Sequence, residues 1–399
     1  MNSIILEEAK HLGPWNGEAE LLSIYLAMQQ LSDARRKQGK RYPLALVLTY
    51  LLVGKAAGET TLQAITEWIR LRGEWLPQVL PQAGPHFPCA ATYSNVLRAV
   101  DPVQLNQVLM DLLTRVRAKQ REEGEQRHVA LDGKTLRGTQ GHLPEDQQKM
   151  HQVSLYETHT GVVLKEQIVG KKENELSRVE EFLTPQWLKG RIISADALHT
   201  QQAFCLGVRL AGGDYVLVAK GNQPTLQEDL HLFFCEPPAD CHDWRSASSC
   251  NNGHGRLERR EVIASTELNE WLERSWSGIA QVFRLCRRVC KPLVCTQEIV
   301  YGFTSLTPAQ ACPKLLLELI RDHWAIENRL HRRRDGTFQE DACQVRKGCA
   351  PRTLALLNSF LLALFDWLGV SNVASSMRTL AARPILALRL FLLSLERIK

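Results

Sequence analysis

The chain has 399 residues, of which 44% are hydrophobic and 23% charged, and its formal net charge at pH 7 is +6. This composition is ordinary for a soluble globular protein, and the length suffices for two or three domains. The positive charge permits a nucleic-acid partner without requiring one. No run of about 18 uncharged apolar residues occurs, and the N-terminus lacks the layout of a signal peptide. We therefore expect a cytoplasmic protein with no membrane span.

The first part of the chain is predicted to be a helical domain, which we bound at residues 1–122. Apolar residues recur there at intervals of three and four, the spacing of one face of an α-helix. The predicted helices cover residues 19–31, 41–58, 61–71 and 103–119. A charged stretch, 118–128, follows them and is typical of a linker.

After this linker, short apolar runs alternate with helical stretches over residues 123–234. We predict strands at 127–133, 190–196 and 214–222, a hairpin of two strands at 151–170, and helices at 174–188 and 201–213. A hairpin meander followed by parallel crossover units predicts a mixed α/β sheet. A second β-rich stretch occupies residues 235–312, and helices resume over 313–399.

The eleven cysteines are an odd number in a long chain that we place inside the cell. This argues against a disulfide framework, and most of them are expected to be small core residues. A structural zinc at Cys235, Cys241 and Cys250, with His242 and His254 nearby, is the alternative, although zinc ligands are usually more tightly spaced.

Two aspartates stand at the ends of apolar runs. In HVALDGKTLRGT the first strand is expected to end at Asp132, and in IISADA the next parallel strand ends at Asp196. Functional groups in open α/β sheets gather at the carboxyl ends of strands. Two carboxylates close together repel unless a cation lies between them, and Mg²⁺ suits such a pair. Alternatively, Asp132 is a turn residue and Asp196 a helix N-cap, but their shared position favours a metal site.

A third carboxylate is expected from the helix that contains IENRLH. His323, Glu327 and His331 are spaced at four and share one stripe of that helix. Such charge density also suits a solvated helix face, so this alternative stays open.

Glu340 and Asp341 compete with Glu327 for the third place, and the pattern of residues alone does not choose among them. We favour Glu327, because Gly336 is expected to end the helix. A catalytic carboxylate needs a backbone fixed to within about 0.5 Å, which a helix provides better than the segment beyond it.

Several segments, taken in order, resemble the H-repeat-associated branch of the insertion-sequence transposases, within the wider DDE group. The likeness is carried by LDGKTLRGT, ISADALHT, YVLVAKGNQPTLQEDL, HGRLERR and the run from IRDHWAIENRLH to TLALL. RYPLALVLTYLLVGKAAGETTLQAITEW is similar to the N-terminal region of those proteins. The resemblance extends over residues 30–370.

This resemblance implies an RNase H-like core with flanking helices, with residues 235–312 as a β-rich insertion before the last catalytic helix. The helix and the C-terminal helices then occupy residues 313–399. Asp132, Asp196 and Glu327 take the places of the catalytic, metal-binding triad. The implied cofactor is Mg²⁺ or Mn²⁺, as two ions.

In the wider group a tyrosine, an arginine and a lysine accompany the glutamate. Their places are held here by Ile320, His323 and Arg334, and the histidine resembles what this branch uses. After NRLH the family usually continues with a tryptophan and apolar residues, whereas this chain reads RRRDG.

The implied function is DNA transposition, in which element ends are cut and joined to target DNA. Lys134, Arg137 and Lys220 would hold DNA phosphates beside the metals, as would His323 and Arg334, although the first three also fit ordinary turn or strand-end charges. Residues 235–312, with HGRLERR and RLCRRVCK, are expected to contact DNA or a partner subunit.

Terminal inverted repeats would be recognised by the N-terminal helices, with residues 58–75 either part of a helix-turn-helix or a plain packing helix. A homo-oligomer on double-stranded DNA is expected. Two other classes stay open: an RNase H-like endonuclease that cuts without joining, and a catalytically inactive, domesticated DNA-binding protein.

Overall fold

The computed structural model describes residues 23–74, 76–79, 86–118, 127–139, 150–169, 179–253 and 255–393. Most of the predicted linker, part of the helix predicted at 174–188, and His254 lie outside these residues. No helix in the described part of the chain is long and apolar enough to cross a membrane.

One nine-stranded mixed sheet forms the centre of the fold, in the order β3-β2-β1-β4-β5-β9-β8-β7-β6. β1, β4 and β5 are parallel, and all other neighbours are antiparallel. The predicted RNase H-like arrangement, a meander followed by parallel crossovers, is confirmed. The strands are β1 (His128–Leu136), β2 (Met150–Glu157), β3 (Val162–Val169), β4 (Ile192–Ala195), β5 (Asp214–Ala219), β6 (Arg245–Gly253), β7 (Arg256–Ser265), β8 (Gln281–Lys291) and β9 (Val294–Thr304).

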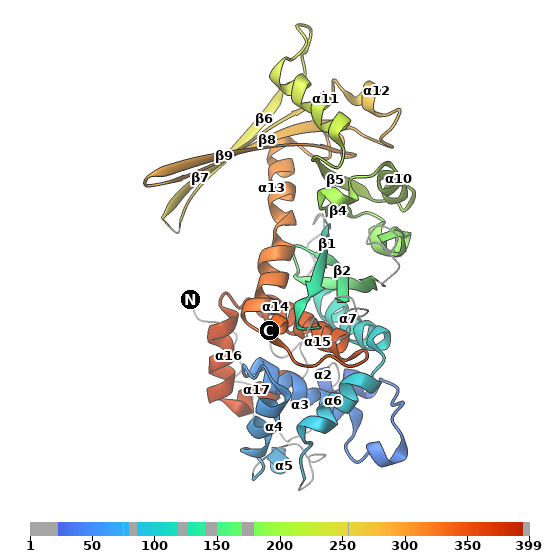
Figure 1. The fold of residues 1–399 in the computed structure, drawn as a ribbon, viewed down its shortest axis with the longest axis vertical. Helices are drawn as coiled ribbons and strands as arrows, with labels where there is room; N and C mark the ends of the chain where they lie inside the picture. The colour runs from blue at the N-terminus through green and yellow to red at the C-terminus, as the bar shows by residue number, and fades with distance from the viewer. Residues whose placement is uncertain are drawn as a thin grey trace.

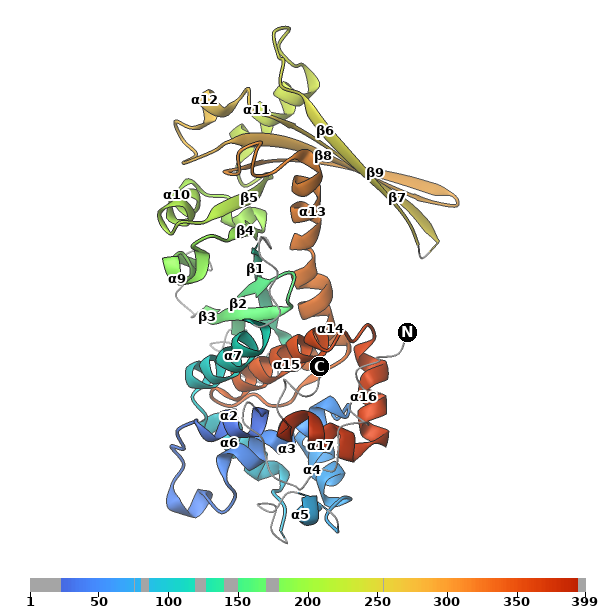
Figure 2. The same ribbon diagram turned by 180° about the vertical axis from the view of Figure 1, so that it is seen from behind.

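The β-rich stretch continues the core sheet, since β9 pairs with β5 from Val216↔Thr304 to Ala219↔Tyr301. The outer halves of β6 to β9 extend beyond the core as a twisted arm (Figures 1 and 2). In the arm nearly every residue of β6 and of the first half of β9 is exposed or half-buried. β6, RSASSCNNG, lies outside the predicted strands because its sequence has no alternation of apolar and polar residues.

Helices from both ends of the chain pack together below the sheet (Figure 1). All residues of α3 are buried, and so are all residues of α15 except Arg352 and Asp366. α15 packs against α6, α7 and β3, and α17 against α2 and α3. The helices are α2 (Ile24–Gln29), α3 (Leu44–Ala56), α4 (Leu62–Arg70), α5 (Leu76–Val79), α6 (Ala90–Ala99), α7 (Pro102–Ala118), α15 (Ala350–Trp367), α16 (Val373–Ala382) and α17 (Pro384–Leu392).

A long helical run connects the arm with this helical layer (Figure 2). It consists of α13 (Pro313–His323), a π-helix, η5 (Ile326–His331), and α14 (Arg332–Gly336), so it ends at Gly336 as predicted. The apolar side of α13, with Leu316 and Leu319, packs on Val262 and Phe283 of the sheet. Shorter helices flank the other strands: α9 (Pro185–Leu188), α10 (Gln202–Leu210), α11 (Pro224–Cys235) and α12 (Asn269–Leu272).

The cysteines differ from our expectation. Cys290 and Cys295, directly opposite each other on β8 and β9, form a disulfide. Of the free cysteines only Cys205 is buried. The prediction that most cysteines are core residues was therefore wrong, because most of them lie on the arm, in loops or at the end of a helix, where neighbouring residues do not enclose the side chain.

Candidate active site

The two aspartates occupy equivalent positions on neighbouring parallel strands. The ladder between β1 and β4 ends with Leu131↔Ala195, and Asp132 and Asp196 directly follow these two residues in the chain. Neighbouring strands lie about 4.8 Å apart, so the two residues are adjacent. We predicted that the first strand ends at Asp132, and this was wrong. β1 continues to Leu136, because it keeps its pairing with β2.

One carboxylate oxygen of each aspartate accepts a hydrogen bond from the backbone of the following residue. Asp132 Oδ1 accepts a hydrogen bond from the backbone of Gly133 at 2.8 Å, and Asp196 Oδ1 accepts one from Ala197 at 2.7 Å. Asp196 is thus also an N-cap, of the short 3₁₀-helix η4 (Ala197–His199). Its side chain is 57% exposed, whereas that of Asp132 is 24% exposed.

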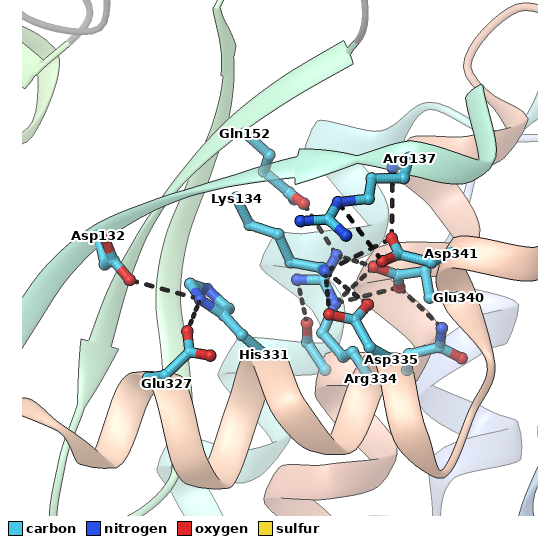
Figure 3. A network of polar contacts seen from close by, with 12 residues as sticks. Asp132, Lys134, Arg137, Gln152, Glu327, His331, Arg334, Asp335, Glu340 and Asp341 are labelled. Atoms are coloured by element: carbon cyan, nitrogen blue, oxygen red, sulfur yellow. Dashed lines mark hydrogen bonds and ion pairs between the residues drawn. The ribbon is translucent and has the colours of Figure 1, made fainter. Parts of the chain in front are cut away.

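Glu327 lies in the π-helix and points toward Asp132 (Figure 3). His331 lies between the two acids: its Nδ1 is 3.3 Å from Glu327 Oε2 and 3.4 Å from Asp132 Oδ2. Ligand atoms of these three residues all lie within 4.8 Å of one another, and they form the only such group in the described ranges. A π-turn widens the helix locally and is frequent at functional sites.

Electrostatics explain the place of His331. Burial lowers the pKa of its imidazole, but hydrogen bonds to Asp132 and Glu327 outweigh burial and leave the pKa above its usual value. The hydrogen bond from His331 in turn lowers the pKa of Glu327 against the effect of burial. Two neighbouring carboxylates favour a cation between them, and this explains why they favour the protonated form of the His331 imidazole.

The same donor set fits a divalent ion. Two carboxylates and an imidazole suit Mn²⁺, and the carboxylates with water suit Mg²⁺. Nε2 of His331 is buried without a hydrogen-bond partner in the described structure, which leaves this ring without a second anchor. Asp132 and Glu327 therefore can hold one ion, and the exposed Asp196 on the next strand offers a further oxygen ligand.

The competing carboxylates are engaged elsewhere. Glu340 is buried, and its two oxygens accept from Nε of Arg334 at 2.9 and 3.0 Å. Asp341 lies 3.8 Å from Nζ of Lys134 and 3.9 Å from Nε of Arg137. Neither belongs to the group around Asp132, an arrangement that favours Glu327 as the third acid.

Of the five residues predicted to hold DNA, the four lysines and arginines divide into two groups. Arg137 is 74% exposed and Lys220 57% exposed, with Nζ of Lys220 3.9 Å from Asp196. Lys134 is only 7% exposed, and its Nζ lies 2.5 Å from Asp335 Oδ1. Arg334 is fully buried. All four lie near acids of the chain, but only Arg137 and Lys220 are exposed enough to reach a phosphate.

His323, the fifth of these residues, takes part in a chain of hydrogen bonds behind the site. Its Nδ1 lies 2.9 Å from Ser194 Oγ, which lies 2.8 Å from Nε2 of His128. Burial lowers the pKa of His323, although Asp132 and Asp196 act in the opposite direction. Burial, together with His323, lowers the pKa of His128 to about 3, so that ring is neutral.

Sequence reasoning did not single out Asp335, Glu166 or Ser194. Each contacts a predicted site residue from a distant part of the chain, so no local spacing identifies it. Ile320, at the place of the wider group's tyrosine, lies in the apolar cluster under α13. Burial raises the pKa of Glu166, whereas the charge and hydrogen bonds of Arg334 outweigh burial at Glu340 and lower its pKa.

Comparisons with known proteins identify the family of this chain. The family described as "Transposase DDE domain" matches residues 123–364, and the family described as "DDE_Tnp_1-associated" matches residues 26–113. The chain therefore belongs to the DDE transposase family. The predicted likeness to insertion-sequence transposases is confirmed, and with it the class of protein.

Individual relatives come from bacteria. A Xanthobacter autotrophicus protein, "Uncharacterized protein in dhlA 3'region", is 31% identical over 62% of this chain and 83% of its own length. "Putative transposase YncI" of Escherichia coli O157:H7 is 27% identical over 82% and 84%. "H repeat-associated putative transposase YhhI" of Escherichia coli K12 is 25% identical over 66% and 69%. Among solved structures, a piggyBac transposase synaptic complex with hairpin DNA has a TM-score of 0.43 at 12% identity, covering 90% of this chain and 76% of that one.

Proposed function

We propose that this transposase cuts and joins DNA ends by two-metal-ion phosphoryl transfer, with Asp132, Asp196 and Glu327 as the metal ligands. The observation that carries the proposal is the meeting of Asp132 and Glu327 beside His331, with Asp196 at the equivalent position of the next strand. Divalent ions bound there would activate the attacking hydroxyl and stabilise the leaving oxygen.

The chain's own residues then have separate tasks. Asp132, Asp196 and Glu327 hold the ions, and His331 orients two of these acids and offsets their repulsion. Lys220 lies beside Asp196 and is well exposed, so it is placed to hold a phosphate next to the reacting one. Arg137, directly after β1, is also exposed and supplies a second positive charge for DNA phosphates.

The arm supplies a second surface for DNA. Arg259 and Arg288 are directly opposite each other on β7 and β8, and both are exposed. Arg288 donates to the Gln297 amide oxygen, and no ion pair to either arginine occurs among the residues described. Like charges directly opposite destabilise a sheet, so this pair favours an anionic partner such as a phosphate backbone.

The other face of the arm is different. Arg256, Arg260 and Arg287 surround the buried Glu258, and Arg287 also lies 3.5 Å from Glu298. Their charge is largely balanced within the sheet. We therefore assign DNA contact to the face with Arg259 and Arg288, and stabilisation of the arm to the face with Glu258.

Recognition of terminal inverted repeats is assigned to the helical N-terminal region, and assembly on DNA to a homo-oligomer. α4 follows α3 after a short turn, and its Gln63, Glu67 and Arg70 are exposed. This arrangement is compatible with a reader helix presented on the buried α3.

A defined DNA substrate tests the function. The wild-type protein is incubated with Mg²⁺ and a duplex that carries the inverted repeats flanking its own gene, together with a supercoiled target plasmid. We expect metal-dependent cleavage at the repeat end and joined product. Cleavage with no joining, even of pre-cleaved ends, would instead identify an endonuclease, and binding with neither reaction would identify an inactive DNA-binding protein.

A further inference from the structure

Arg334 is the largest fully buried side chain of the described structure. Its guanidinium contacts Glu340 at 2.8 Å through Nη2 and Glu166 at 3.2 Å through Nη1. Nη2 also donates to the side-chain oxygen of Gln152 at 2.9 Å, and Nη1 lies 3.5 Å from Ser359 Oγ. A side chain so enclosed cannot reach a DNA phosphate without leaving two carboxylates unpaired in the core.

These partners come from different parts of the fold. Gln152 and Glu166 lie on β2 and β3, Glu340 on the 3₁₀-helix η6 (Glu340–Ala342), and Ser359 on α15. Asn358 of α15 donates to Glu340 at 2.9 Å. One arginine on α14 therefore ties the end of the helical run both to the sheet and to the helix behind it (Figure 3).

The attachment also fixes the rotation of the helix. Lys134 and Gln152 are cross-strand partners on β1 and β2. Gln152 accepts from Arg334, and Lys134 donates to Asp335, the next residue of the helix. Arg334 and Asp335, consecutive residues of α14, thus bind side chains of the neighbouring strands β2 and β1. These contacts leave α14 little freedom to rotate or to shift along its axis.

We propose that Arg334, held by Glu166 and Glu340, is a positioning residue that sets Glu327 against Asp132 and makes no contact with DNA. The π-helix with Glu327 runs directly into α14, so any shift of Arg334 moves Glu327 relative to β1. The charge of Arg334 is matched inside the fold by two buried acids, Glu166 and Glu340. The proposal rests on the proposed metal site.

The test compares Arg334→Met with Arg332→Met, a matched control that removes an exposed arginine from the same short helix. Affinity for Mn²⁺ is measured on the full-length protein by electron paramagnetic resonance of free Mn²⁺. Loss of a residue that orients metal ligands typically weakens metal affinity by about tenfold or more. We expect this loss for Arg334→Met and none for Arg332→Met.

Salt dependence of DNA binding separates positioning from contact. A residue that contacts phosphate changes the slope of log K against log salt by about one when removed. We expect an unchanged slope for Arg334→Met. An unchanged Mn²⁺ affinity with a reduced slope would show that Arg334 contacts DNA and would overturn the proposal. An unchanged Mn²⁺ affinity with an unchanged slope would also overturn it, because Arg334 would then have neither role.

Arg334→Lys keeps the experiment decisive if the methionine variant fails to fold. Lysine retains the buried charge but cannot form the planar two-acid contact. It should fold, as judged by circular dichroism, and bind Mn²⁺ several-fold more weakly than wild type. Wild-type Mn²⁺ affinity in the folded lysine variant would contradict the positioning role. Failure of the wild type to cut DNA would refute the proposed function without touching this difference in Mn²⁺ affinity.

Discussion

Nζ of Lys134 lies 2.5 Å from Oδ1 of Asp335. Lys134 is two residues from Asp132 along β1, and Asp335 is four residues from His331 along the helical run. Two strand residues span about 6.7 Å and four helical residues about 6 Å, so both contacts fit at once. The ion pair thus joins the strand and the helical run in a fixed register, next to Asp132 and Glu327 of the candidate metal site.

Lys134→Met is expected to destabilise the protein by about 1–2 kcal/mol, because a buried ammonium and the hydrogen bonds to Asp335 are lost. Its removal should leave the salt dependence of DNA binding unchanged, since the side chain is 7% exposed. Lys220→Met is the matched control: it should reduce the salt slope by about one and leave stability unchanged. Urea unfolding and salt titrations measure both effects. A reduced slope in Lys134→Met would restore its role as a phosphate contact.

Glu327→Gln is expected to abolish Mg²⁺-dependent cleavage without lowering the melting temperature, because this side chain is 55% exposed. Glu340→Gln should instead lower the melting temperature, since it weakens the buried pair with Arg334. Asp341→Asn should have the smallest effect of the three. Normal cleavage by Glu327→Gln, together with a dead but fully folded Glu340→Gln or Asp341→Asn, would show that the third acid is misassigned.

On the arm, the double change Arg259→Gln with Arg288→Gln is expected to reduce the salt slope of DNA binding by about two, equally for all DNA sequences. Arg256→Gln is the control, because Arg256 faces Glu258 on the other side of the sheet. Fluorescence anisotropy at several salt concentrations measures the slopes. Should the double variant bind DNA like wild type but lose self-association, the surface would belong to a partner subunit.

Glu258 gives a pH-dependent prediction. Burial raises the pKa of this carboxyl, but the hydrogen bond from Arg287 and the charges of Arg260 and Arg256 outweigh burial and leave the pKa below its usual value. Its ion pairs therefore stabilise the fold above the unfolded pKa of about 4.3, and this stabilisation is lost as the pH falls through the folded pKa.

Glu258→Gln should accordingly cost about 2 kcal/mol of unfolding free energy at pH 7, and progressively less below pH about 4. Denaturant unfolding of both proteins across this range measures the difference. If the loss of unfolding free energy in Glu258→Gln does not change with pH, the shape of the Glu258 side chain rather than its charge stabilises the arm.

Much of this fold could be predicted from the sequence because its apolar residues report the geometry directly. The core strands with Leu131 and Ala195 are short apolar runs, and an aspartate directly after each run locates both acids at one edge of the sheet. β6 could not be predicted in this way, because it is paired on one side only and exposes most of its residues.

The roles of the cations were harder to predict. Lys134 and Arg137 are only three positions apart in sequence, yet Lys134 is buried against Asp335 and Arg137 is exposed. Burial of Arg334 depends on Glu166, 168 residues away. Sequence pattern indicates which residues carry charge, but only the tertiary structure determines which charges remain free for a ligand.

The central claim, that Asp132 and Asp196 share one metal-dependent site with Glu327, is tested most directly by single-turnover cleavage of the element-end duplex by Asp132→Asn and Asp196→Asn. Each change removes a ligand charge without altering side-chain volume, so we expect cleavage to fall to background while DNA affinity and melting temperature stay at wild-type values. Full cleavage by Asp132→Asn in Mg²⁺ would contradict the account.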